Sequence, residues 1–218
     1  MGKLMKCPLN EYAKVVWHKV DVNGKGVQAR VTLPSAKTIK PNDFINFYLG
    51  FGEYEIGLST RTTKLNGDDN PNPDNKWRWF VNSTAKMGET DFTQPWIYSD
   101  GETVTIKAFF NSVGQVEFHV NGVKVWQGTA KTIGTVSNCR FVIGCAQQST
   151  GAGYPWHLLH NQVVVQNLMY RNANDAWVNV TSANGHTEYT NCPDNATEKQ
   201  YIHTDINGIG GALYASLK

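Results

Sequence analysis

Apolar and polar residues alternate through the middle of the chain with the period of two that is typical of β-strands. Between Glu102 and Trp126 this alternation predicts three consecutive strands, the last two joined by the dipeptide Asn121-Gly122. Asn-Gly between alternating segments is the strongest short-range signal for a β-hairpin with a two-residue turn. We expect one face of these strands to be buried and the other to be polar. The predicted buried face carries Val104, Ile106, Ala108, Phe110, Val116, Phe118 and Val120.

The same pattern extends to both sides of this central segment. It predicts strands at 15–20, 27–33, 44–51, 54–61, 76–82, 139–144, 162–171 and 177–181. The apolar residues of the 162–171 strand stay on one face only if a β-bulge lies near Asn167. Roughly ten to twelve short strands separated by turn residues are typical of an all-β sandwich. The chain, 218 residues long, suits a single domain of this class, residues 1–218.

Two motifs carry a resemblance to a known superfamily. The hairpin from Phe118 to Val125 has the form F-x-V-N-G-x-x-V, and the strand Cys139-Arg140-Phe141-Val142-Ile143-Gly144 ends in an apolar-Gly step. Both resemble the central strands of concanavalin A-like domains, which include laminin-G-like modules, legume-type lectins, carbohydrate-binding modules, glucanases and polysaccharide lyases. The resemblance extends over residues 44–144 and implies an antiparallel two-sheet β-sandwich, a concanavalin A-like jelly roll. Because binders and enzymes share this fold, it does not choose between them.

Charge and hydropathy argue against two classes of partner. The net charge is +2 and Lys and Arg do not cluster, so we expect no nucleic-acid partner. No apolar run reaches the length of a membrane span, so we expect no membrane insertion. The first residues lack the apolar region of a signal peptide, which fits either an intracellular protein or one whose leader has been removed. The resemblance implies a secreted or cell-surface protein, and the sequence leaves its oligomeric state open.

The four cysteines allow two interpretations. Cys139 and Cys145 lie six positions apart on one predicted strand, too far apart to bridge each other. Cys7 and Cys192 lie near the two ends of the chain, which concanavalin A-like sandwiches usually bring together, so the resemblance implies a Cys7–Cys192 disulfide. Free buried thiols are the equal alternative. No cysteine spacing suggests zinc.

Polar side chains on the outward faces of the predicted strands are the first candidates for a ligand-binding groove. Arg, Asn, Glu and His can hydrogen-bond the hydroxyl groups of a sugar. An ordinary solvated face is the alternative for each of them. The candidates are Glu55, Ser59, Arg61, Arg78, Asn82, Lys107, Glu117 and His119.

Large aromatic residues in predicted loops are the second group of candidates. Loops carry function, and sugar rings stack on aromatic faces, whereas plugging the ends of the sandwich is the alternative role. Trp77 and Trp79 share a face with Val81 and are therefore expected in the core. The loop candidates are Trp96, Tyr98, Tyr154 and Trp156.

A polar loop at 64–75 supplies candidate metal ligands. Asp68, Asp69 and Asp74 lie there among asparagines, and carboxylate and amide oxygens at this density can bind calcium, as in related lectin-like domains. A solvated turn is the alternative, because Asn and Asp are favoured in turns. Calcium is thus the single candidate cofactor, and no cofactor at all is the other expectation.

Catalytic patterns of the superfamily match poorly. The E-x-D-x-x-E pattern of retaining glucanases of this fold is absent. Alginate-type lyases combine an Arg-rich strand, a Gln-x-His strand and a later Tyr. Here Glu117-Phe118-His119 stands where Gln-x-His is expected, Tyr170 lies on a later strand and Arg78 is one available cation, but no Arg-rich strand accompanies them.

The sequence therefore predicts a non-catalytic protein that binds a glycan or polysaccharide. A polysaccharide lyase or glycoside hydrolase that uses Glu117, His119, Arg78 and Tyr170 is the first alternative. A structural or protein-interaction module is the second.

Overall fold

The computed structural model describes residues 3–4, 13–34, 44–60, 76–83, 90–91, 95, 97–130, 133–146, 160–191, 202–207 and 212–217. The regular structure in this part of the chain consists of sixteen β-strands. They are β1 (Lys3–Leu4), β2 (Ala13–Val20), β3 (Gly26–Thr32), β4 (Phe44–Phe51), β5 (Tyr54–Ser59), β6 (Arg78–Ser83), β7 (Thr90–Asp91), β8 (Thr103–Phe110), β9 (Gln115–Val120), β10 (Val123–Thr129), β11 (Arg140–Ala146), β12 (His160–Arg171), β13 (Trp177–Asn179), β14 (Gly185–Asn191), β15 (Ile202–Asn207) and β16 (Ala212–Leu217). None of the described segments forms a long apolar helix of the kind that crosses a membrane.

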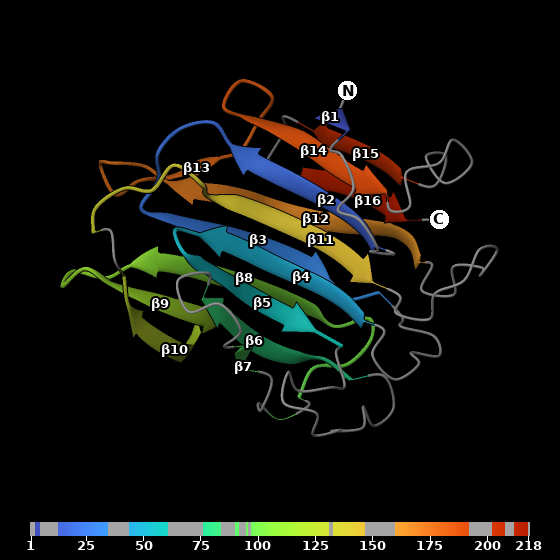
Figure 1. The fold of residues 1–218 in the computed structure, drawn as a ribbon, viewed down its shortest axis with the longest axis horizontal. Coiled ribbons are helices and arrows are strands. Elements are labelled where there is room, and N and C mark those ends of the chain that lie inside the picture. Colours follow the sequence, from blue (N-terminus) through green and yellow to red (C-terminus); the bar gives the residue numbers. More distant parts are fainter. Residues whose placement is uncertain are drawn as a thin grey trace.

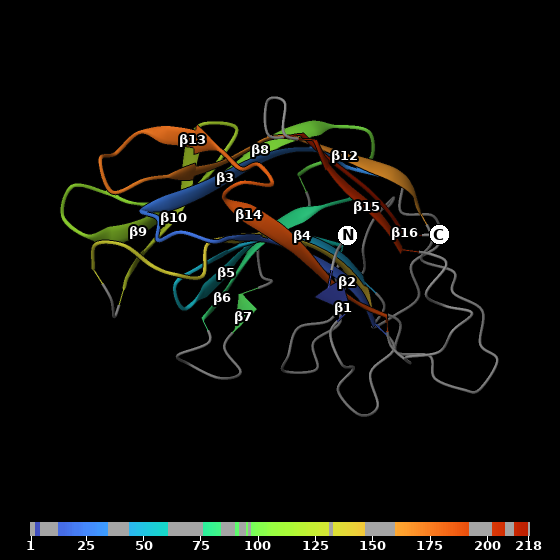
Figure 2. The ribbon, with the colours of Figure 1, turned by 90° about the horizontal axis from the view of Figure 1, so that it is seen from above.

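The strands form two sheets (Figure 1). The first sheet has the order β1-β14-β2-β11-β4-β5-β6-β7, and the second has the order β10-β9-β8-β3-β12-β16-β15, with β13 paired to β12. The short β1–β14 pair is parallel, and the long central pairs, such as β11–β4 and β3–β8, are antiparallel. Figure 2 shows the sheets as two layers, with β3, β8 and β12 in one and β4, β5 and β6 in the other. The two-sheet antiparallel β-sandwich predicted from the sequence is confirmed.

The core lies between the two layers and is built by the alternation that the sequence displays. Val104, Ile106 and Ala108 of β8 are fully buried, whereas the residues between them are partly exposed. From the first sheet, Phe47 and Leu49 of β4 meet them with no exposed surface. Removing a side chain of this size from water contributes about 1.5 to 3 kcal/mol. One face of each central strand therefore packs inward, and the other becomes an outer surface of the molecule.

Two local predictions of backbone geometry are confirmed. Asn121 and Gly122, which join β9 to β10, have φ angles of 51° and 80°, the positive values that a two-residue turn of this type needs. Asn167 also has a positive φ of 51°, and the register of β12 against β3 shifts between Gln166 and Met169. That bulge keeps Val165, Leu168 and Tyr170 together in the core.

The C-terminal part of the structure differs from the sequence prediction. β14, β15 and β16 are not among the strands predicted from the sequence. Of these, β14 reads GHTEYTN and carries no apolar face of its own. β14 is nevertheless held in the first sheet by seven paired positions along β2. Pairing with a neighbour, rather than a hydrophobic pattern, makes this segment a strand.

The cysteine predictions are tested at one position. Cys139 is buried and free, so it forms no disulfide with Cys145. Burial raises the pKa of the Cys139 thiol to about 12. Cys7 and Cys192 lie outside the described residues, and their disulfide stays a prediction.

Candidate functional site

The polar residues expected to line one groove lie on two opposite surfaces. Glu55 and Arg78 belong to β5 and β6 of the first sheet, whereas Glu117 and His119 belong to β9 of the second. Each pair alternates with core residues, so each faces away from the core of the sandwich. The single groove is therefore a wrong expectation, because alternation fixes the face of a strand but not the sheet that the strand joins. Arg61 lies outside the described residues.

The outer face of the first sheet carries a polar network that crosses four neighbouring strands. The Glu55 carboxylate accepts hydrogen bonds from Arg140 Nη2 at 3.1 Å and from Asn82 Nδ2 at 3.2 Å. The Tyr48 hydroxyl also hydrogen-bonds Glu55. Burial and the adjacent Glu55 carboxylate raise the pKa of Tyr48, so the phenol stays protonated and can donate to that carboxylate. Glu55 thus has three partners within the protein.

Much of this first outer face is covered. Arg78 and Val142 have no exposed surface, and Phe80 is 3% exposed. Ser59 is also fully buried and donates a hydrogen bond of 2.5 Å to Asn46. Arg78 therefore cannot meet a large ligand as the protein stands, whereas Glu55 and Arg140 keep part of their side chains exposed.

The outer face of the second sheet presents half-buried aromatic rings around a lysine. Lys107 of β8 places its ammonium 4.6 Å from the centre of the Trp177 ring and 5.1 Å from the centre of the Phe109 ring. His119 of β9 packs against Phe109, with ring centres 5.0 Å apart. We call this surface the Trp177 platform. Its members are Lys107, Phe109, Glu117, His119, Arg171 and Trp177.

A glycine explains how two large rings fit side by side on this sheet. Gly26 pairs with Phe109 on one side and with Arg171 on the other, and Arg171 pairs with Trp177. A Cβ atom at Gly26 would lie 2.7 Å from Phe109 Cβ and 3.0 Å from the Trp177 ring. Because position 26 has no side chain, the indole can lie over β3 and approach the phenyl ring.

The ammonium of Lys107 has aromatic neighbours but no oxygen partner among the described residues. Burial and the nearby guanidinium of Arg171 lower its pKa. Arg171 itself is occupied, since it donates to the Phe110 carbonyl at 3.0 Å and pairs with Asp175 at 3.2 Å. Lys107 is therefore the cation of the platform whose hydrogen-bond donors are directed neither to a carbonyl nor to a carboxylate.

Glu117 and His119 form a polar pair at the edge of the platform. His119 Nε2 lies 2.8 Å from Glu117 Oε2, and Asn111 Nδ2 donates to Glu117 Oε1 at 3.1 Å. The hydrogen bonds from His119 and Asn111, together with Lys124, lower the pKa of Glu117 despite the opposing effect of its burial. Glu117 is thus held as a carboxylate that orients the imidazole.

The four residues of the catalytic alternative do not come together. Glu117 and His119 are neighbours, but Tyr170 faces the core from the opposite side of the same sheet and is 9% exposed. Arg78 lies on the other sheet and is fully buried. The lyase-like quartet is therefore a wrong expectation, because the sandwich separates its members into three environments.

The loop aromatics are tested at one position only. Tyr98 lies beside Trp77 in an isolated β-bridge and is 8% exposed, so it belongs to the core. Burial raises the pKa of Tyr98 to about 12. The expectation that Tyr98 contacts a ligand is wrong, since its ring is enclosed rather than presented at a loop tip. Trp96, Tyr154 and Trp156 lie outside the described residues and stay predictions.

The calcium prediction falls on residues that the structure does not describe. Asp68, Asp69 and Asp74 all lie in the 61–75 gap. Within the described ranges, no group of three or more His, Cys, Asp or Glu side chains lies close enough to hold a metal ion.

Of the six platform residues, the candidates predicted from the sequence include Lys107, Glu117 and His119 but miss Phe109, Arg171 and Trp177. One signal points to this surface: Phe109 shares the polar face of its strand with Thr103, Thr105 and Lys107. A large aromatic residue at an outward position next to a lysine indicates an exposed ring. The pairing of Trp177 with Lys107 across β12 and β3 is a long-range contact that no local pattern contains.

Comparisons with known proteins support the fold. No family model matches the sequence, and no curated protein matches it. Scytalido-glutamic peptidase with a peptide-based transition-state analogue is similar in structure, with a TM-score of 0.59, 9% identity, and coverage of 96% of this chain and 99% of that one. SCP-B, a member of the eqolisin family of peptidases in complex with the tripeptide Ala-Ile-His, has a TM-score of 0.54, 9% identity and the same coverage. At this identity the likeness concerns the fold alone.

A lectin is also found, at a lower level of similarity. CG-16, a homodimeric agglutinin from chicken liver, has a TM-score of 0.36 and 13% identity, over 60% of this chain and 92% of that one. This similarity is too low to support an argument about either fold or function.

Proposed function

We propose that the protein is a non-catalytic carbohydrate-binding protein and that its binding surface is the Trp177 platform. The observation that carries the proposal is the Lys107 ammonium, which lies between two aromatic rings with no oxygen partner among the described residues. An oxygen atom of a docked sugar would satisfy these donors.

The platform combines the two features that sugar recognition requires. The rings of Trp177 and Phe109 offer apolar faces on which the C–H groups of a pyranose can stack. Lys107 donates hydrogen bonds, and the Glu117–His119 pair can donate and accept at the edge. Stacking would hold the ring in place, and the polar groups would select its hydroxyl pattern.

Accessibility favours this surface over the outer face of the first sheet. Phe109, Lys107 and Trp177 are all partly exposed. On the first sheet, Phe80 is buried and the Glu55 carboxylate already accepts hydrogen bonds from the protein. A ligand on that side would compete with internal partners, whereas a ligand on the platform adds partners to Lys107.

The test is affinity electrophoresis against a panel of soluble polysaccharides that includes neutral glucans and xylan as well as acidic pectate and alginate. We expect retarded migration with at least one of them. If no polysaccharide in the panel retards the protein and a glycan array also gives no signal, the proposal is overturned.

Three variants locate the binding surface. Trp177→Ala and Lys107→Gln should each weaken binding by about tenfold, since about 1.4 kcal/mol corresponds to that factor. Trp17→Ala is the matched control, because Trp17 lies on the first sheet. Circular dichroism and thermal unfolding establish that each variant is folded. If both platform variants bind the polysaccharide as tightly as the wild type, the binding site lies outside the platform.

A polysaccharide lyase or glycosidase is the second candidate, and the Glu117–His119 pair at 2.8 Å is the observation that favours it. New reducing ends or unsaturated products in the same mixtures, lost in His119→Ala, would support cleavage. Because solved proteins with this fold include peptidases, casein belongs in the same assay. Binding without any of these products is the result that the first proposal expects.

A further inference from the structure

The three central strands of the second sheet carry an excess of positive charge. The sequences of β3, β8 and β12 contain no Asp or Glu, but they include Arg30, Lys107 and Arg171. Because β3 lies between β8 and β12, these cations belong to neighbouring strands. An anionic ligand on this part of the sheet would therefore meet attraction from three strands and no carboxylate of their own.

Arg30 extends the positive charge along β3, on the same outer face as Lys107. In the register of β3 against β8, Gln28 pairs with Lys107, and Arg30 pairs with Thr105. Arg30 follows Gln28 by two residues, so its side chain points to the same side of the sheet and lies about 7 Å farther along the strand. Arg30 is exposed. A chain of linked sugar units on the platform could thus reach Lys107 with one unit and Arg30 with a following one.

The carboxylates at the margins of this surface already contact cations of the protein. Glu117 lies 3.5 Å from Lys124 Nζ, and Asp175 lies 3.2 Å from Lys25 Nζ. Lys107, in contrast, has no oxygen partner among the described residues. The two carboxylates are therefore compensated, whereas the charge of the Lys107 ammonium is not.

Lys107 and Arg171 approach the same aromatic ring. The Lys107 ammonium lies 5.1 Å from the centre of the Phe109 ring, and the Arg171 guanidinium carbon lies 5.8 Å from it. Burial, and secondarily the repulsion from this guanidinium, lower the pKa of Lys107. An anion bound beside the ring would offset the repulsion, and its hydrogen bonds with an ammonium would be stronger than those of a neutral hydroxyl group.

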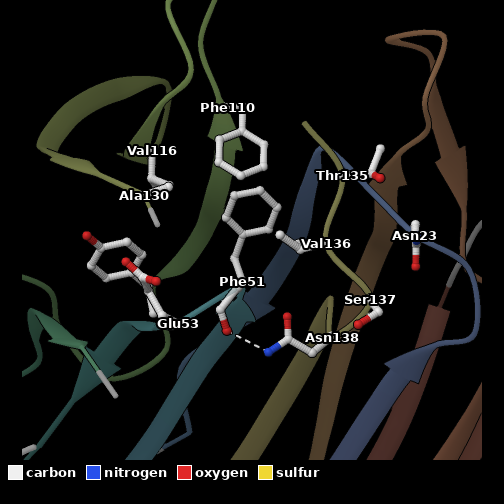
Figure 3. Close-up of a pocket in the computed structure, with 12 residues that line it drawn as sticks. Asn23, Phe51, Glu53, Phe110, Val116, Ala130, Thr135, Val136, Ser137 and Asn138 are labelled. Atoms are coloured by element: carbon white, nitrogen blue, oxygen red, sulfur yellow. Dashed lines mark hydrogen bonds between the residues drawn. The ribbon is translucent and has the colours of Figure 1, made fainter. Parts of the chain in front are cut away.

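The platform offers a ligand more accessible ring surface than the hollow at one end of the sandwich. That hollow lies beside the β4–β5 turn, and Figure 3 shows Phe51 and Phe110 in its wall. Phe51 has no exposed surface and Phe110 is 6% exposed, so a ligand there would contact mainly the polar rim. Phe109 and Trp177 are partly exposed. On the platform, a ligand can therefore reach aromatic rings and a cation at the same time.

We propose that the ligand of the platform is an acidic polysaccharide whose sugar units carry carboxylates. The pyranose ring of one unit would stack on the Trp177 and Phe109 rings, and its carboxylate would accept hydrogen bonds from the Lys107 ammonium. The carboxylate of a following unit would approach Arg30. This inference rests on the proposed carbohydrate-binding function and names the class of polysaccharide that the site selects.

The test compares ligands that differ mainly in charge. Polygalacturonate and alginate are the acidic polysaccharides, and the methyl ester of the first and the propylene glycol ester of the second are their neutral counterparts. Poly-L-glutamate supplies carboxylates without sugar rings. We expect at least one acidic polysaccharide to bind about tenfold more tightly than its own ester, than neutral xylan or glucan, and than poly-L-glutamate.

Four variants connect this preference to particular side chains. Lys107→Gln should lower the affinity for the acidic polysaccharide by about tenfold, and Arg30→Gln by about threefold, because Arg30 is more exposed. Lys107→Arg keeps the charge and should stay within about threefold of the wild type. Lys25→Gln is the matched control, because it removes the same charge from an ammonium that already contacts Asp175; its affinity should stay within about twofold.

The outcomes separate this inference from the proposed function. If neutral xylan or glucan binds as tightly as the acidic polysaccharides, or if esterification does not weaken binding, carbohydrate binding stands and the preference for acidic sugars is overturned. The preference is also overturned if poly-L-glutamate binds as tightly, if Lys107→Gln and Arg30→Gln both bind like the wild type, or if Lys25→Gln weakens binding as much as Lys107→Gln. If no polysaccharide binds, the proposed function and this inference fail together.

Discussion

His18 should make the protein lose stability as the pH falls below neutral. The imidazole is fully buried in β2, its Nδ1 lies 3.1 Å from Thr187 Oγ1, and its Nε2 has no hydrogen-bond partner within the described part of the chain. Burial, and secondarily the charge of His186, lower its pKa from 6.5 to about 3. Below about pH 6.5 the His18 imidazole therefore binds a proton in the unfolded chain but stays neutral in the folded protein. The free energy of unfolding then decreases as the pH falls.

The magnitude follows from these two pKa values. Linkage gives a loss of about 2 kcal/mol between about pH 7 and about pH 5, a window in which most carboxylates are still ionised. The full difference of about 3.5 pKa units would amount to roughly 5 kcal/mol, reached only below about pH 3. A loss of about 2 kcal/mol is a large share of the stability of a typical domain.

Urea unfolding followed by tryptophan fluorescence at the two pH values measures this loss. His18→Leu removes the titrating group and the unpaired nitrogen, so its stability should change by about 2 kcal/mol less than that of the wild type over the same interval. His186→Gln is the control for the exposed histidine that contacts Asp21 and Glu188. Equal pH dependence in the wild type and His18→Leu would refute the reasoning, whatever the absolute stability of the variant.

Three further perturbations test other parts of the structure. Gly57→Ala should destabilise the first sheet by about 1 to 3 kcal/mol in urea unfolding, because its Cβ would lie 2.0 Å from a backbone oxygen of β4. Cys139 should resist iodoacetamide in the native protein and react in urea, as mass spectrometry of its peptide would show, since the thiol is buried and its pKa is raised. Glu55→Gln combined with Arg140→Met in a double-mutant cycle should give a coupling of about 1 kcal/mol; a value near zero would mean that the 3.1 Å ion pair adds nothing.

Local backbone features could be predicted because short sequence windows contain their causes. Asn121-Gly122 predicts a turn with two positive φ angles, and the structure has them. The bulge at Asn167 follows from the need to keep Val165 and Leu168 on one face. In both cases the constraint acts over fewer than about ten residues, the range in which alternation is informative.

The candidate site could be predicted only in fragments. Alternation places Glu117 and His119 on an outward face, and the structure agrees. It cannot tell that Glu55 faces outward from the other sheet, since that depends on β5 pairing with β4 rather than with β9. Tyr98 illustrates the complementary error, because a loop position does not reveal that this residue is buried and forms a β-bridge with Trp77. Pairing between segments that are far apart in the sequence decides which surface such a side chain faces.

Consecutive residues at the end of β8 lie on opposite faces of the second sheet. Phe109 faces outward to the platform, and Phe110 faces inward to the core, because successive side chains of a strand point to opposite sides. Arg171 spans both, since its guanidinium lies 5.8 Å from the Phe109 ring centre and donates to the Phe110 carbonyl. β8 is paired on both edges, with β3 and β9, so its backbone is held on both sides.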